Sequence, residues 1–152
     1  MSMLRSGLLL LAAIAAVAGP ACADPAAPSP DFAPGQEWSI RSTAPTTAKV
    51  IIGRVESWSG DRIAVSISVI DVPTPQGGVT VISHMPFDKA ALAGSVDKLL
   101  ATGVSPDPGF EGGYKQWRDA KGGIFTISVE KAIELAFQAI PPQQRAEAAG
   151  TH

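Results

Sequence analysis

The chain has 152 residues, with 12 Lys and Arg against 14 Asp and Glu. Phosphate binding needs clustered Lys and Arg, and because the chain has no basic stripe, its composition argues against nucleic acid and anionic membrane surfaces as partners. The single cysteine, Cys22, leaves no pair for an intramolecular disulfide. A chain of this length predicts one domain with a modest core.

The first 23 residues have the pattern of a cleaved signal peptide. Arg5 precedes an apolar run, and small residues up to Ala23 form a site that signal peptidase accepts, which predicts cleavage after Ala23. The run is too short to span a membrane, and no later segment reaches spanning length, so no integral membrane segment is expected after cleavage. The predicted location is periplasmic or secreted. An alternative is a lipoprotein anchored through Cys22, although the preceding Gly-Pro-Ala matches a lipoprotein signal poorly.

Cleavage would change both the charge and the thiol chemistry of the chain. Without Arg5, the 12 basic residues become 11 against 14 acidic ones, which gives a net charge of −3. Cys22 would leave with the signal peptide. Thiol catalysis, thiolate metal sites and thiol redox chemistry are therefore not expected.

The domain limits follow from the composition of the two ends. Residues 24–35, DPAAPSPDFAPG, are rich in Pro, Ala and Ser, which predicts a disordered spacer. Residues 141–152 have no apolar anchor and are predicted to form a disordered tail. Residues 36–140 between them are predicted to form a single α+β domain.

Strand signals dominate the first half of this domain. Residues 36–42, 49–58, 62–71 and 77–83 carry β-branched or alternating apolar residues, most clearly from Ile63 to Val69. Gly53 interrupts the second segment and predicts a bulge or a close backbone approach. Because no helix separates these segments, they predict an antiparallel meander with one face on the core.

Helix signals follow the meander. Asp88 is a candidate N-cap, and Phe87 and Leu92 have the spacing of a hydrophobic staple. The apolar stripe continues from Leu92 to Leu100, so the helix is expected to run until Gly103.

The last third of the domain predicts a short helix within residues 111–123 and a fifth strand at residues 123–128. Ser128 is then expected to cap a final helix that Pro141 ends. The whole pattern predicts an α+β fold: an antiparallel four- to five-stranded meander sheet with two to three helices packed on one face.

Chemical signatures are sparse along the chain. His84 and the C-terminal His152 are its only histidines, and no acidic loop has the spacing of a calcium site, so neither a metal nor a cofactor is expected. Isolated Gly-Gly pairs do not make a phosphate-binding loop, and no Gly-x-Ser-x-Gly elbow is present. No catalytic residue is therefore assigned.

His84 has two interpretations. As a functional residue, its imidazole could act as general base with a serine or an activated water, which would make the protein a small hydrolase. As a structural residue, it ends the last strand of the meander, and its ring nitrogens bond the backbone where the chain turns into the helix at Asp88. The lack of an identifiable partner favours the structural interpretation.

Tyr114 and Trp117 lie on one side of the expected short helix. Together with Trp38 and Trp58, they could form a stacking platform for a sugar or a peptide. The alternative is that these rings cover the edges of the core, which is favoured for Trp38. His84, Tyr114 and Trp117 are therefore the candidate binding residues.

Four motifs occur in order along the domain: GQEWS, HMP, GYKQW and GIFTISV. With this combination, residues 35–138 resemble a widespread family of small bacterial proteins with the pattern Gly-Gln-x-Trp-Ser, His-Met-Pro, Gly-Tyr-x-x-Trp and Gly-x-Phe-Thr-Ile-Ser-Val. The matched positions are Gly35, Trp38, His84, Met85, Pro86, Tyr114, Trp117 and Phe125. The family has no assigned activity, so the resemblance implies no ligand, cofactor or catalytic residue. The signal peptide and the Pro-rich spacer depart from its usual pattern.

The sequence thus predicts an exported, non-catalytic binding or interaction module, whose partner is a protein or a small ligand. A protein-directed version would be an inhibitor or an immunity-type partner of another protein, and it predicts an exposed apolar patch. The alternatives are the hydrolase that uses His84 and a small-ligand binder that uses Tyr114 and Trp117.

Overall fold

The structure is a computed structural model that describes residues 29–139. The predicted signal peptide and the predicted tail lie outside these residues. The strands are β1 (Glu37–Ile40), β2 (Lys49–Ser57), β3 (Ile63–Pro73), β4 (Val79–Asp88) and β5 (Val96–Ala101), and the helices are α1 (Lys89–Ser95), α2 (Phe110–Asp119) and α3 (Val129–Ala139).

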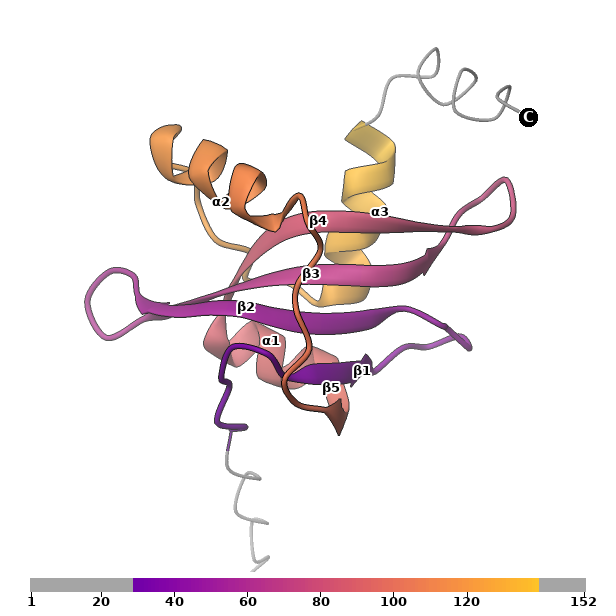
Figure 1. Cartoon of the computed structure of the whole chain (residues 1–152), viewed down its shortest axis with the longest axis horizontal. Helices are drawn as coiled ribbons and strands as arrows, with labels where there is room; N and C mark the ends of the chain where they lie inside the picture. Colours follow the sequence, from indigo (N-terminus) through magenta and orange to yellow (C-terminus); the bar gives the residue numbers. More distant parts are fainter. Residues whose placement is uncertain (1–28, 140–152) are drawn as a thin grey trace, which may run out of the picture.

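The five strands form one antiparallel sheet in the order β4-β3-β2-β1-β5. Strands β1 to β4 follow one another as a meander, and β5 returns beside β1 at the edge opposite to β4 (Figure 1). The predicted α+β fold is confirmed, with an antiparallel five-stranded sheet and three helices in the part of the chain that the structure describes.

The helix after Asp88 is shorter than its apolar stripe predicted. Asp88 does cap α1, because its Oδ1 accepts a hydrogen bond from the Ala90 amide at 3.0 Å, but the helix ends at Ser95. The residues that follow form β5, which pairs with β1. The open edge of β1 offers these residues a ladder of backbone hydrogen bonds, and this tertiary pairing outweighs the local helical spacing.

The fifth strand is therefore β5, and the strand predicted at residues 123–128 was wrong. In that segment a single parallel bridge joins Phe125 to Phe87 of β4. The Phe125 amide donates to Pro86 O, and Phe125 O accepts from the Asp88 amide, both at 2.9 Å. Residues 123–128 thus pass along the outer edge of β4 between α2 and α3.

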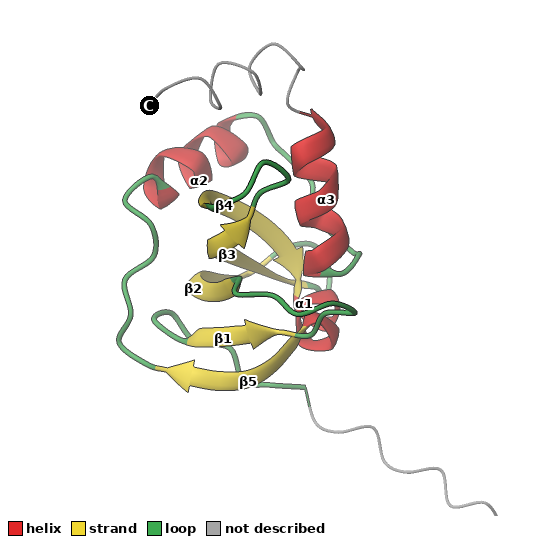
Figure 2. Cartoon of the chain, turned by 90° about the vertical axis from the view of Figure 1, so that its right-hand side faces the viewer, coloured by secondary structure: helices red, strands yellow, loops and turns green. Residues whose placement is uncertain are grey.

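The two sides of the sheet carry different helices (Figure 2). On one side, called here the core face, α1 and α3 pack with Val65, Ile67 and Val69 of β3 into the main hydrophobic core. Ser66 and Ser68 point to the other side, called here the α2 face, which α2 partly covers. Two helices therefore share one face as predicted, and the third lies opposite, so the central part of β3 is buried on both sides.

A bulge in β2 decides which of its side chains face α2. The partners of Ile52 and Arg54 are successive residues of β3, so Gly53 is an extra residue between them. The bulge turns Arg54 and Glu56 toward the α2 face, where an unbroken alternation would have placed them on the core face. A Cβ atom on Gly53 would lie 2.2–2.7 Å from the Phe110 ring, so the predicted bulge and the predicted close approach are both confirmed.

A second bulge shapes β4. Ile82 and Met85 pair with β3 residues that only Ser68 separates, so Ser83 and His84 together stand opposite one residue. Ile82 and Met85 contribute to the hydrophobic core, whereas Ser83 and His84 both turn to the α2 face. The two bulges therefore direct polar side chains of β2 and β4, the two strands that flank β3, toward α2.

The segment before β1 belongs to the packed structure. Phe32 is only 8% exposed, and its ring meets Trp38 edge-on with centroids 5.7 Å apart. Gly35 has a φ of +89°, and its amide donates to Ile52 O at 2.8 Å. The packed unit therefore begins before residue 36, within the described part of the segment predicted as a spacer.

Candidate functional site

His84 lies inside β4 and not at a strand–helix corner. The strand continues through Pro86 to Asp88, which is possible because proline is tolerated in an edge strand. The half-buried imidazole places Nε2 3.1 Å from Ser66 Oγ of β3. The prediction that the ring nitrogens bond the backbone was wrong, because the hydrogen-bond partner of Nε2 is a side-chain hydroxyl.

Aromatic rings of α2 close over His84. The ring centroid of His84 lies 5.5 Å from that of Phe110, 5.8 Å from Tyr114 and 5.5 Å from Trp117. These three α2 residues are spaced so that they share one helical face. Gly113 lets the helix approach, since a Cβ there would lie 2.7 Å from the Cβ of His84. The structure thus brings the three predicted site residues together.

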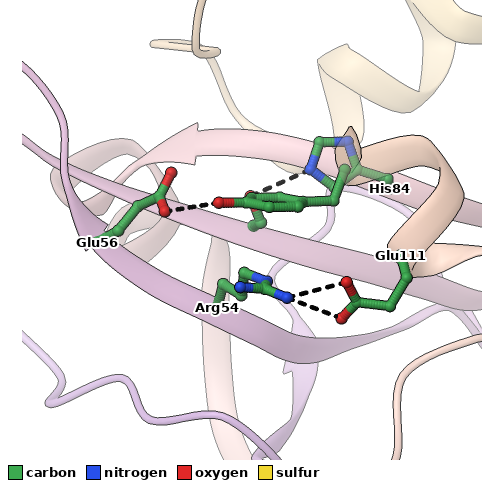
Figure 3. A network of polar contacts seen from close by, with 6 residues as sticks. Arg54, Glu56, His84 and Glu111 are labelled. Carbon is green, nitrogen blue, oxygen red and sulfur yellow. Dashed lines mark hydrogen bonds and ion pairs between the residues drawn. The ribbon is translucent and has the colours of Figure 1, made fainter. Parts of the chain in front are cut away.

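A network of charged side chains flanks this aromatic cluster (Figure 3). Glu56 accepts hydrogen bonds from Tyr114 Oη at 2.8 Å and from Arg118 at 3.1 Å. Arg54 donates to both carboxylate oxygens of Glu111, at 3.1 and 2.9 Å, and its guanidinium lies 4.3 Å from the Tyr114 ring centroid. The network ties α2 to β2 by cation–π and charge-assisted contacts.

Burial sets the protonation of the site. Loss of hydration lowers the pKa of His84 below 6.5, and the negative charge of Glu56 opposes this shift only in part. The pKa of Tyr114 is raised, first by burial and then by its hydrogen bond to Glu56. At neutral pH the site therefore holds a neutral imidazole beside a protonated phenol.

A shallow hollow of about 440 Å³ opens beside His84. It is lined by Ser83, His84, Gly113, Gln116, Trp117, Ala120 and Gly122. All of these side chains are uncharged when His84 is neutral. Nε2 of His84 is taken by Ser66, but Nδ1 has no hydrogen-bond partner among residues 29–139.

Trp117 lines the hollow, but its ring is already packed against other parts of the protein and is not a free stacking platform. Its ring stacks on Trp58 with centroids 5.1 Å apart, and its Nε1 donates to Gly123 O at 2.9 Å. Gly122 lies against the same ring, because a Cβ there would be 2.3 Å from Trp117 Cδ1. A sugar stacked on this indole would therefore have to displace contacts that the fold already makes.

Nucleophilic catalysis is disfavoured by the position of Ser66. Its hydroxyl is the one in hydrogen-bond reach of His84, yet Ser66 is only 1% exposed beneath the imidazole. A serine nucleophile has to meet the substrate carbonyl, so this pair cannot attack an external substrate without a rearrangement. The positions of Ser66 and His84 therefore suit the binding of a ligand group better than nucleophilic cleavage of a substrate bond.

A second hollow, of about 470 Å³, lies away from α2 and includes Val79 and Leu100 on its lining. Within residues 29–139, no group of three or more potential ligands is placed to hold a metal ion. No helix in that same range is long and apolar enough to cross a membrane.

Comparison of the chain with known protein families, with curated proteins and with solved structures finds no match. The resemblance based on the motifs around Trp38, His84, Trp117 and Phe125 therefore stays a prediction.

Proposed function

We propose that the protein is an exported, non-catalytic binding module that holds an uncharged group of its ligand or partner in the hollow beside His84. One observation carries the proposal: a neutral imidazole lines the hollow with its Nδ1 free of partners among the described residues. This nitrogen can make one hydrogen bond with a bound group, while the uncharged lining disfavours a charged one. The signal peptide pattern ending at Ala23 supports the export.

The charged side chains beside the hollow are already engaged in contacts with one another or with Tyr114. Glu56 is held by Tyr114 and Arg118, and Arg54 is held by Glu111. The hydrolase alternative would therefore need His84 to activate a water molecule alone, because Ser66 is buried. A binding role uses the site as it stands.

A protein partner, such as the target of an inhibitor or immunity-type module, has a specific observation in its favour. Large apolar side chains are exposed on both edge strands: Val79 and Val81 on β4, and Leu99 and Leu100 on β5. Such residues on the surface are typical of interaction sites when they gather in patches.

The test compares the native chain with a variant whose hollow is filled. Gln116→Trp places an indole in the hollow, and Lys115→Trp puts the same ring on the neighbouring exposed position as a matched control. Each protein is immobilised and exposed to an envelope extract, and the retained proteins and small molecules are identified by mass spectrometry. We expect a component that the native chain and Lys115→Trp retain and that Gln116→Trp loses.

Equal retention by all three proteins, or retention of nothing, contradicts the proposal. Circular dichroism of each variant checks that the fold is intact. A small molecule that the native chain releases in a chemically altered form, but that His84→Gln releases unchanged, would support the hydrolase instead.

A further inference from the structure

The edge of the sheet at β4 is only partly occupied. Phe125 pairs with the end of this strand through its bonds to Pro86 and Asp88. The outward backbone groups of residues 79–82 have no hydrogen-bond partner within the described chain. An edge strand with unpaired amides and carbonyls is a template for another strand.

The side chains of this open segment favour pairing. Residues 79–82 read Val-Thr-Val-Ile, which are β-branched and uncharged, and Val79 and Val81 are 60% and 44% exposed. The other edge strand, β5, carries Asp97 and Lys98, charges of the kind that protect an edge from pairing. The two edges therefore differ, and β4 is the one left open.

The open edge leads directly into the hollow beside His84. Ser83 and His84 follow residues 79–82 on the same strand and line the hollow together with α2 and Gly122. Beyond them the edge is again paired, by Phe125. An added strand would therefore bring a side chain to the mouth of the hollow as it passes Ser83.

We propose that the partner is an extended, uncharged peptide segment of another protein, which adds to β4 along residues 79–82 as a sixth strand and inserts one side chain into the hollow beside His84. Backbone pairing would supply affinity, and the hollow would select the inserted side chain. This inference rests on the proposed function for the hollow itself. In Figure 2, α2 and α3 lie on opposite faces of the sheet, with β4 between them.

The test selects random dodecapeptides displayed on phage against the full chain and measures the binding of the selected peptides by fluorescence anisotropy. Val81→Lys introduces a charge on the open edge, and Leu99→Lys is its matched control on β5, where Leu99 is 46% exposed. We expect Val81→Lys to weaken peptide binding by about tenfold or more, and Leu99→Lys to leave it unchanged. Selection against Gln116→Trp should return peptides whose inserted residue is smaller than in the peptides selected against the native chain, because the indole fills part of the hollow.

The outcomes separate the two proposals. Peptides that bind Val81→Lys as tightly as the native chain but are lost with Gln116→Trp overturn strand addition and leave the hollow standing as the site. Peptides that are weakened by Val81→Lys and indifferent to Gln116→Trp support strand addition and contradict the role of the hollow. A selection that returns no binding peptide, or a dimer of the chain that Val81→Lys abolishes, overturns the inference.

Discussion

At the scale of single residues, His84 couples stability to pH. Burial lowers its pKa in the folded protein, while in the unfolded chain it titrates near its ordinary value of 6.5. Between the two pKa values the unfolded chain binds a proton that the folded protein excludes. The contribution of His84 is therefore complete above pH 6.5 and is lost as the pH falls below it.

This gives the first prediction. The free energy of unfolding of the native chain should fall between pH 7.5 and 5.5, and it should fall less in His84→Gln, as measured by urea denaturation. The lowered pKa values of Asp88 and Glu130 act in a more acidic window, below their ordinary values of 3.8 and 4.5. An NMR titration should place the His84 midpoint below 6.5. The same decline in both proteins would contradict the assignment.

Gly53 and Gly112 provide a matched pair for the second prediction. Gly53→Ala should lower the free energy of unfolding by about 1–3 kcal/mol, because its Cβ would press into the Phe110 ring. Gly112 lies within α2, and a Cβ there would meet no other part of the described chain within 4 Å, so Gly112→Ala should raise that free energy by about 0.5–1 kcal/mol. Chemical denaturation measures both free energies. A Gly53→Ala protein as stable as the native chain would refute the close packing of Phe110 against Gly53.

The sequence could identify the candidate residues of the site but not their partners. His84, Tyr114 and Trp117 stand out by type and spacing, and the structure brings them together. Glu56 and Arg54 were missed because simple alternation along β2 puts them on the wrong face. Only the bulge at Gly53 turns them toward α2, and although Gly53 indicated a bulge, the sequence did not show which residues would face the helix.

At the scale of secondary-structure elements, Asp88 begins α1 and also binds Arg62. Its Oδ1 caps the helix at Ala90, and its Oδ2 accepts from Arg62 Nε at 2.9 Å. The third prediction is that Asp88→Ala lowers the free energy of unfolding by about 1 kcal/mol and Asp88→Asn by less, because the amide oxygen can still cap. The control Asp97→Ala removes only an exposed contact to Arg41 and should change thermal unfolding little.

The sequence could predict those elements that depend on residues close together in the chain. The alternation of apolar residues predicted the meander, and the capping residue Asp88 predicted where α1 begins. The change from α1 to β5 depends on the edge of β1, which lies more than 50 residues earlier in the chain. The apolar spacing from Leu92 to Leu100 suits a helix equally well, so sequence periodicity could not decide between them.

At the scale of the whole molecule, the fold depends on residues before the first strand. Phe32 fills the core beside Trp38, although its segment has a composition typical of a spacer. The fourth prediction is that Phe32→Ala lowers the free energy of unfolding by about 3 kcal/mol, and that Phe32→Leu, which keeps most of the apolar volume, costs much less. Calorimetry of both variants measures this, and equal stability of Phe32→Ala and the native chain would show that the anchor is dispensable.

The bulge in β2 also determines where this protein tolerates a change of length. Along a regular strand, the loss of one residue exchanges the two faces for every residue beyond it. Position 53 is an exception, because without Gly53 the side chain of Ile52 would still face the core and that of Arg54 would still face α2. The loss of Val55 would instead turn Glu56 away from Tyr114 and into the apolar side of the sheet. Deletion of residue 53 would therefore leave the later side chains of β2 on their present faces of the sheet. Deletion of residue 55, only two positions away, would move the side chains that follow it to the opposite face.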